Sequence, residues 1–142
     1  GNFLNFSYTH AAIKKNLGKI GVLLSFETTK KKDQLLVFGK QLAMHIAASS
    51  PLSIDKGDLD QNILKKEMEI ITEELKNSGK DTKIVDKIAA GKLNKFITDN
   101  TLVNQEWIME PKKQVKDVLK EIAGKDKIEI KKFTRFKVGE GI

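Results

Sequence analysis

The middle of the chain carries two consecutive stretches in which apolar residues recur every three or four positions, separated by a short break. The first stretch has Leu64, Met68, Ile71 and Leu75, widened by Ile63 and Ile70. The second has Val85, Ala89, Leu93, Phe96 and Ile97. Asn77-Ser78-Gly79 between them is typical of a helix end. Because each amphipathic helix must bury its apolar stripe, the pattern predicts an antiparallel helical (coiled-coil) hairpin at about residues 58–98.

The flanks of this hairpin have a different pattern. Residues 19–27 form a short apolar run rich in β-branched and aromatic residues, and residues 5–9 alternate apolar and polar. Both features predict strands, with a turn at residues 14–18. A last strand is expected at residues 128–138. Asp33 is a candidate cap for a helix that ends before Ser50-Pro51, and a shorter helix is expected to end at Gly124.

The residues between the hairpin and the shorter helix are expected to be irregular or extended over positions 101–109, with the chain redirected at Glu110-Pro111. The sum is an α+β fold, in which a small antiparallel sheet is packed with helices and a helical hairpin projects from it. With 142 residues, the chain is long enough for one domain with its own core, so residues 1–142 are expected to form one domain with the hairpin inserted.

Composition excludes several classes of protein. There is no cysteine, which rules out disulfides, catalytic thiols and thiolate metal sites. No run of about 18 apolar residues could span a membrane. The first residues do not resemble a signal peptide, so we expect a cytoplasmic protein (bacterial) or one of an organellar matrix.

The basic charge lies toward the two ends. The net charge is +7, with six lysines and one acid in residues 1–32, and ten basic residues and four acids in residues 112–137. Residues 55–100 hold nine lysines and ten acids. Such an excess can bind nucleic acid or simply keep the surface solvated, and the second interpretation is the commoner one.

Catalytic motifs are missing, so no enzymatic activity, cofactor, metal or catalytic residue is expected. The two histidines are not spaced as metal ligands. Gly79-Lys80-Asp81-Thr82 resembles the end of a P-loop, but Glu74 occupies the upstream glycine position, and a turn between helices explains it better. His45 lies near the apolar stripe of its helix, where a buried structural histidine is the usual interpretation.

Several blocks together resemble translation elongation factor Ts, in the family's order over residues 19–142. The blocks are Lys19-Ile20-Gly21-Val22-Leu23, residues 42–49 followed by Pro51, Ser78-Gly79-Lys80, residues 86–96, Gln105 with Ile108-Met109-Glu110-Pro111, and residues 135–142.

The resemblance implies a guanine-nucleotide exchange factor of translation elongation and protein biosynthesis. Its partner would be elongation factor Tu, GDP-bound or nucleotide-free, from which it promotes GDP release by protein binding alone. Self-association as a homodimer is compatible with this role, since some family members dimerise.

The resemblance also implies which residues bind the partner. They are Ile20, Gly21, His45, Ile108 and Met109, with Trp107, Gly79 and Lys80 as further contacts. His45 would present an exposed imidazole beside small alanines. Gly21 would either face the partner or allow close approach inside a strand. Trp107 stands where the family usually has phenylalanine, and it is either a core residue or an interface anchor.

The sequence also departs from the family. The family's N-terminal helical domain has no counterpart here, and no Thr-Asp-Phe-Val motif occurs. We therefore expect the chain to be a fragment, the core or dimerisation domain of a longer protein, that binds elongation factor Tu weakly and promotes exchange poorly by itself.

A basic nucleic-acid-binding domain is the alternative function. It would need aromatic residues interleaved with lysines for base stacking. Phe133-Thr134-Arg135-Phe136 is the only such segment, and it belongs to the family's terminal signature.

Overall fold

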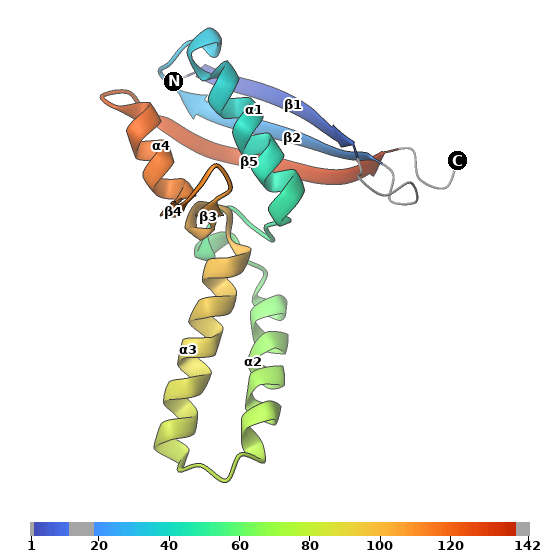
Figure 1. The fold of residues 1–142 in the computed structure, drawn as a ribbon, viewed down its shortest axis with the longest axis vertical. Coiled ribbons are helices and arrows are strands. Elements are labelled where there is room, and N and C mark those ends of the chain that lie inside the picture. Colours follow the sequence, from blue (N-terminus) through green and yellow to red (C-terminus); the bar gives the residue numbers. More distant parts are fainter. Residues whose placement is uncertain (1, 12–18, 139–142) are drawn as a thin grey trace. The chain divides into compact units, whose positions relative to one another are not determined.

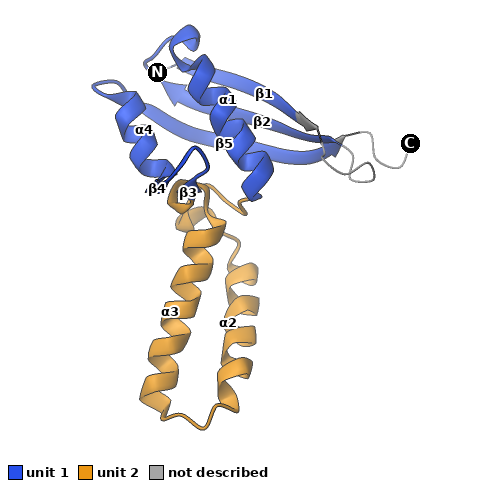
Figure 2. Ribbon diagram, in the orientation of Figure 1, with its two compact units in different colours: residues 1–50, 106–142 blue, residues 51–105 orange. Residues whose placement is uncertain are grey.

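The computed structural model describes residues 2–11 and 19–138, and the turn expected at residues 14–18 lies outside them. The described chain divides into two compact units (Figure 2). The first, called the sheet unit, comprises residues 1–50 and 106–142. The second, called the hairpin unit, comprises residues 51–105. The α+β fold with a small antiparallel sheet is confirmed.

The sheet unit is built on three antiparallel strands, β1 (Asn2–Ala11), β2 (Lys19–Thr28) and β5 (Ile128–Val138), with β2 in the centre (Figure 1). Helix α1 (Lys32–Ser49) covers one face of the sheet, here called the inner face. Val22, Leu24 and Phe26 alternate along β2 and are buried on that face. They meet the helical stripe of Leu35, Phe38, Leu42 and Ile46, which is also buried. The core of the unit thus consists of alternate side chains of β2 packed against side chains that recur every three or four residues along α1.

Helix α1 starts two residues earlier than a cap at Asp33 would place it. Lys31 is the N-cap, and the Gln34 side chain accepts a hydrogen bond from its backbone N–H at 2.9 Å, so Asp33 lies in the first turn and is not the cap. At the other end, Ser50 adopts a left-handed conformation and Pro51 follows. Arg135 of β5 donates from Nε to the carbonyl oxygen of Ala47 at 3.1 Å. A positive charge at the C-terminal end of a helix interacts favourably with the negative end of the helix dipole.

The rest of the sheet unit is a small hairpin and a helix. Strands β3 (Glu106–Trp107) and β4 (Glu110–Gln114) pair antiparallel, and α4 (Val115–Ala123) follows directly. The sequence had predicted only an irregular or extended segment here. Pro111 is compatible with β4 because a two-stranded sheet consists of edge strands, which tolerate proline.

The hairpin unit consists of α2 (Gln61–Lys76) and α3 (Thr82–Asn100), preceded and followed by 3-10 turns at Lys56–Asp58 and Leu102–Asn104. Helix α2 begins later than the expected Asp58, because the Asp60 carboxylate accepts from the N–H of Asn62 at 2.9 Å and caps the helix. At the open end, Leu102 donates its N–H to the carbonyl of Ser53 at 2.9 Å. Leu59 and Leu102 are buried there.

Candidate functional site

His45 is fully buried in the sheet unit. Its ring stacks on Trp107, with ring centres 5.4 Å apart and planes 18° apart. Its Nδ1 accepts a hydrogen bond from the backbone N–H of Ile108 at 3.3 Å. The expected exposed imidazole is therefore wrong. The reason lies in helix geometry: His45 falls seven residues after Phe38 and three after Leu42, on the stripe that faces the core.

Trp107 belongs to the same core. It is 4% exposed, and its ring also lies against Phe38, with centres 5.8 Å apart. Phe38 in turn stacks on Phe26 of β2. A chain of aromatic contacts thus runs from the central strand through α1 to the β3–β4 hairpin. These aromatic contacts hold the β3–β4 hairpin against the core of the sheet unit.

Ile108 and Met109 form the two-residue turn of the β3–β4 hairpin, since Trp107 pairs with Glu110. Ile108 is half-buried, and its N–H is held by His45. Met109 is 52% exposed. The arrangement presents one flexible, apolar side chain to solvent on a turn whose base is fixed by two buried rings. Methionine in such a position adapts readily to a partner surface.

Ile20 and Gly21 lie on β2, away from that turn. Ile20 shares the inner-face parity of Val22, whereas Gly21 points to the opposite, outer face of the sheet. Gly21 pairs with Phe136 of β5, and a Cβ atom at Gly21 would lie 2.6 Å from that ring. The glycine thus leaves room for an aromatic side chain. This contact follows from the register that pairs Gly21 with Phe136, and only the structure shows that register.

Gly79 and Lys80 belong to the hairpin unit. They lie in the turn between α2 and α3, where Gly79 has a φ of +72°. That left-handed conformation favours glycine and explains the turn without any phosphate-binding role. Lys80 is exposed. The eight predicted site residues therefore do not form one cluster: four, Trp107 among them, lie together at the β3–β4 turn, two lie on β2, and two lie in the other unit.

Charged side chains of the sheet unit form pairs at its surface, beside β5 and between β4 and α4. Lys131 lies 3.2 Å from Glu27 and 3.2 Å from Glu129. Its hydrogen bond to Glu27 is the main cause that lowers the pKa of Glu27 and raises the pKa of Lys131. Lys113 bridges Glu121 and Glu110, and hydrogen bonds to these carboxylates raise its pKa.

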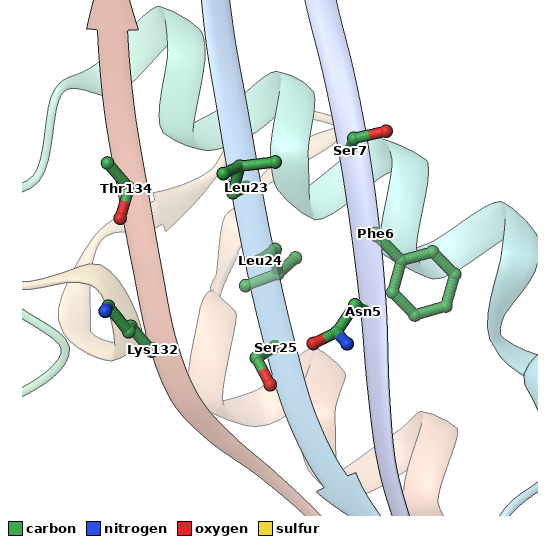
Figure 3. Close-up of a pocket in the computed structure, with 8 residues that line it drawn as sticks. All are labelled: Asn5, Phe6, Ser7, Leu23, Leu24, Ser25, Lys132 and Thr134. Carbon is green, nitrogen blue, oxygen red and sulfur yellow. The ribbon is translucent and has the colours of Figure 1, made fainter.

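A shallow hollow of about 320 Å³ lies over the three strands, and its lining residues include Ser7, Ser25, Lys132 and Thr134 (Figure 3). Within residues 2–11 and 19–138, no three His, Asp or Glu side chains gather in a way that could hold a metal ion. No helix in that part of the chain is long and apolar enough to cross a membrane.

Comparison with known proteins identifies the family. The family model described as "Elongation factor TS" matches residues 2–140. Elongation factor Ts of Erythrobacter litoralis is 41% identical over 138 residues, which cover 95% of this chain and 44% of that protein. Elongation factor Ts of Caulobacter sp. is 38% identical over 139 residues, covering 96% and 44%. That of Bartonella tribocorum is 38% identical over 140 residues, covering 96% and 45%.

The chain thus spans less than half the length of these relatives. The match nevertheless covers nearly all of the chain, across both the sheet unit and the hairpin unit. The chain belongs to the elongation factor Ts family.

Proposed function

We propose that this chain carries the part of elongation factor Ts that binds elongation factor Tu and promotes the release of its GDP. Family membership over residues 2–140 supports the proposal. The structural observation that supports it is the exposed, apolar side chain of Met109, which lies on a turn beside the buried, stacked rings of His45 and Trp107.

The mechanism is a linkage of two binding equilibria. A protein that binds the nucleotide-free form of a GTPase more tightly than the GDP-bound form must weaken GDP binding by the same factor. No covalent bond is made or broken, so the exchange factor needs only a surface of fixed shape. A rigid turn suits this role because little conformational entropy is lost when it docks.

Within this proposal, the predicted residues take different roles. Met109 contacts the partner directly, and Ile108 supports it. His45 acts as a positioning residue, because a fully buried ring cannot reach a partner without rearrangement of the core. Phe136, 40% exposed over Gly21, presents the surface that the Ile20-Gly21 segment was expected to provide.

The test is the affinity of the chain for elongation factor Tu, measured by calorimetry, and the rate of fluorescent GDP release that it induces. Met109→Ala is expected to weaken binding about tenfold, as for an anchor residue at an interface. Leu36→Ala is the matched control, since Leu36 is an aliphatic side chain of the same unit with 49% exposure. Absence of any binding to elongation factor Tu, or equal effects of the two substitutions, would contradict the proposal.

The alternative, nucleic-acid binding, has one observation in its favour. The sheet unit holds 17 basic and 9 acidic residues. Several of these lysines are paired with carboxylates, Lys131 and Lys113 with two each. Such pairing lowers the charge available to phosphates. A gel shift with RNA that disappears at high salt would favour this alternative over the exchange factor.

A further inference from the structure

The inner face of the sheet becomes basic where β5 passes the end of α1. Phe133, on that face, is half-buried. The next two inner-face positions of β5 are Arg135, which pairs with Val22, and Lys137, which pairs with Ile20. Figure 1 shows β2 and β5 continuing beyond the last turn of α1, so the helix covers only part of this face. Ile20, Arg135 and Lys137 are here called the basic end of the sheet.

Arg135 is held in place from one side. Its Nε donates to the carbonyl oxygen of Ala47 at 3.1 Å, and the residue is half-buried. Among the residues that the structure describes, no acceptor lies within hydrogen-bonding distance of its terminal nitrogens Nη1 and Nη2, and no carboxylate forms an ion pair with it. No buried side-chain nitrogen in that part of the chain lacks a partner, so both nitrogens reach solvent. The guanidinium therefore has two donor groups available to a ligand.

Acidic residues lie at the other end of this layer. Strands β1, β2 and β5 and helix α1 contain three: Asp33 in the first turn of α1, and Glu27 of β2, which pairs with Glu129 of β5. Arg135 is opposite Val22, five positions along β2 from Glu27, which is about 17 Å along a strand. Surface charges that far apart are largely screened at physiological salt. No acid of these strands or of α1 therefore neutralises the basic end of the sheet.

We propose that the basic end of the sheet binds a carboxylate side chain, of Asp or Glu, on the surface of elongation factor Tu. The inference rests on the proposed function, and it assigns the chief contact to Arg135. Because Nε is already bonded to Ala47, Nη1 and Nη2 remain to donate side by side to the two oxygens of a carboxylate. A guanidinium that is fixed at one nitrogen loses less side-chain entropy when it docks. Lys137 adds a second positive charge, and Ile20 adds an apolar contact beside it.

Nucleic acid is the competing occupant, because phosphate also accepts two hydrogen bonds from a guanidinium. A nucleic-acid backbone is bound by many cations along a groove, with aromatic rings for the bases. The basic end of the sheet instead presents one guanidinium, one ammonium and a half-buried aliphatic side chain. An arginine combined with an apolar neighbour is typical of a protein–protein interface. A protein carboxylate is therefore the occupant that this surface fits.

Calorimetry with elongation factor Tu at low and high salt tests the assignment. Arg135→Gln removes both the charge and the planar fork, and it is expected to weaken binding about tenfold or more and to reduce the salt dependence of the affinity. Arg135→Lys keeps the charge without the fork, so it should weaken binding less and keep the salt dependence. Lys132→Gln is the matched control. It removes one charge from the outer face of the same strand and should change the affinity by less than about twofold.

The possible outcomes separate this inference from its premise. No binding by the unsubstituted chain would overturn the proposed function, and this inference with it. Binding that Arg135→Gln leaves unchanged, or weakens without changing its salt dependence, would overturn this inference alone. The second of these results is what a purely structural role of Arg135 in holding α1 would give. Loss of RNA binding in Arg135→Gln, with the affinity for elongation factor Tu intact, would assign the site to nucleic acid instead.

Carbodiimide crosslinking of the complex gives a second measurement, because the reagent joins an amine to a carboxylate only where the two are in contact. Mass spectrometry is expected to find Lys137 of the unsubstituted chain, and position 135 of the Arg135→Lys variant, joined to Asp or Glu of elongation factor Tu. Lys132 should not be joined. A complex that crosslinks through other lysines but through neither Lys137 nor position 135 would contradict the proposal. The Lys137 result stands even where a variant at position 135 fails to fold.

Discussion

The sheet unit and the hairpin unit differ in how many apolar side chains they bury and in which segments those side chains come from. In the sheet unit, residues far apart in sequence meet in one core: Phe26 of β2 lies against Phe6 of β1 and Phe38 of α1, at centre-to-centre distances of 5.6 and 6.0 Å. In the two long helices of the hairpin unit, only Ile71, Leu75 and Ile97 are buried. The first unit therefore has a core shared by distant segments, whereas the two helices of the second bury few side chains.

The charges follow the same division. The hairpin unit has 9 basic and 10 acidic residues, so all of the excess positive charge of the chain belongs to the sheet unit. A two-helix hairpin exposes most of its surface and is solvated by mixed charge. The same substitution should therefore have different effects on stability in the two units, which can be measured directly.

The largest expected difference concerns buried and exposed apolar residues. Phe26 is fully buried, so Phe26→Ala is expected to cost about 3–5 kcal/mol of unfolding free energy, through lost transfer energy and a residual cavity. Ile84 of α3 is 50% exposed, and Ile84→Ala should change stability by about 0.5 kcal/mol or less. Urea denaturation followed by circular dichroism measures both. A cost of Phe26→Ala near that of Ile84→Ala would refute the description of the sheet unit's core.

The second difference is in the sign of the stability change on substituting glycine by alanine in a helix. Gly39 lies inside α1 and Gly91 lies inside α3. A Cβ atom at Gly39 would lie 2.6 Å from the Phe6 ring, which is itself 8% exposed and has little room to move. Gly39→Ala should therefore destabilise by about 1–3 kcal/mol through overpacking. Gly91 has open space around its Cβ position, so Gly91→Ala should stabilise by roughly 0.5–1 kcal/mol through helix propensity.

Thermal unfolding of the two glycine variants measures this pair. Opposite shifts of the melting temperature are expected. Stabilisation by Gly39→Ala would mean that the Phe6 ring does not pack against α1 at Gly39, and that this contact does not hold β1 to the helix.

Much of this fold could be predicted from periodicity, because apolar period is a local property. The strands at residues 19–27 and 128–138 and the amphipathic stripes of the hairpin agree with the structure to within a few residues at most boundaries. Two members of the first stripe did not fit: Met68 and Ile70 are 36% and 45% exposed, since two helices alone cannot cover a wide stripe.

The candidate site could be predicted from the sequence less well than the fold. The His45–Trp107 stack joins residues 62 positions apart, and the Gly21–Phe136 contact depends on strand register. Neither follows from local pattern. The exposed imidazole of His45 was expected from the resemblance, which places this residue at the partner, whereas its helical spacing from Phe38 and Leu42 favours the buried histidine that the structure shows. The sequence allows Trp107 to be a core residue or an interface anchor, and its burial places it in the core.

A smaller effect is expected from the positioning role of His45. His45→Phe keeps an aromatic ring against Trp107 but removes the acceptor for the Ile108 N–H, at a cost of about 1 kcal/mol. Because the chain has a single tryptophan, its fluorescence reports on the stack directly. We expect a shifted emission spectrum and weaker binding to elongation factor Tu. Val37→Ala on the same helix, at a 71% exposed side chain, should change neither. An unchanged affinity for His45→Phe would limit His45 to a structural role.

The smallest expected effect is a response to acid confined to the sheet unit. The hydrogen bond from Lys131 lowers the pKa of Glu27 below its usual value of 4.5, and those from Lys30 and Thr29 lower the pKa of Asp126 below 3.8. A carboxyl whose pKa is lowered by folding stabilises the folded state above its usual pKa. That contribution is lost as the pH falls through the lower, folded value. Asp126 is exposed and Glu27 is half-buried at the surface, so salt should weaken the effect.

Lys131→Met tests this. Relative to the unsubstituted chain, the variant should be slightly less stable at neutral pH, and the difference should shrink as the pH falls below about 4.5, where Glu27 gains its proton in the unfolded chain. Lys132→Met removes the same charge from the neighbouring position of β5 but leaves the hydrogen bond to Glu27 intact. Its stability difference should therefore lack this pH dependence. If urea midpoints of both variants follow the same pH curve, net charge and not the Glu27–Lys131 pair governs the acid response of the sheet unit.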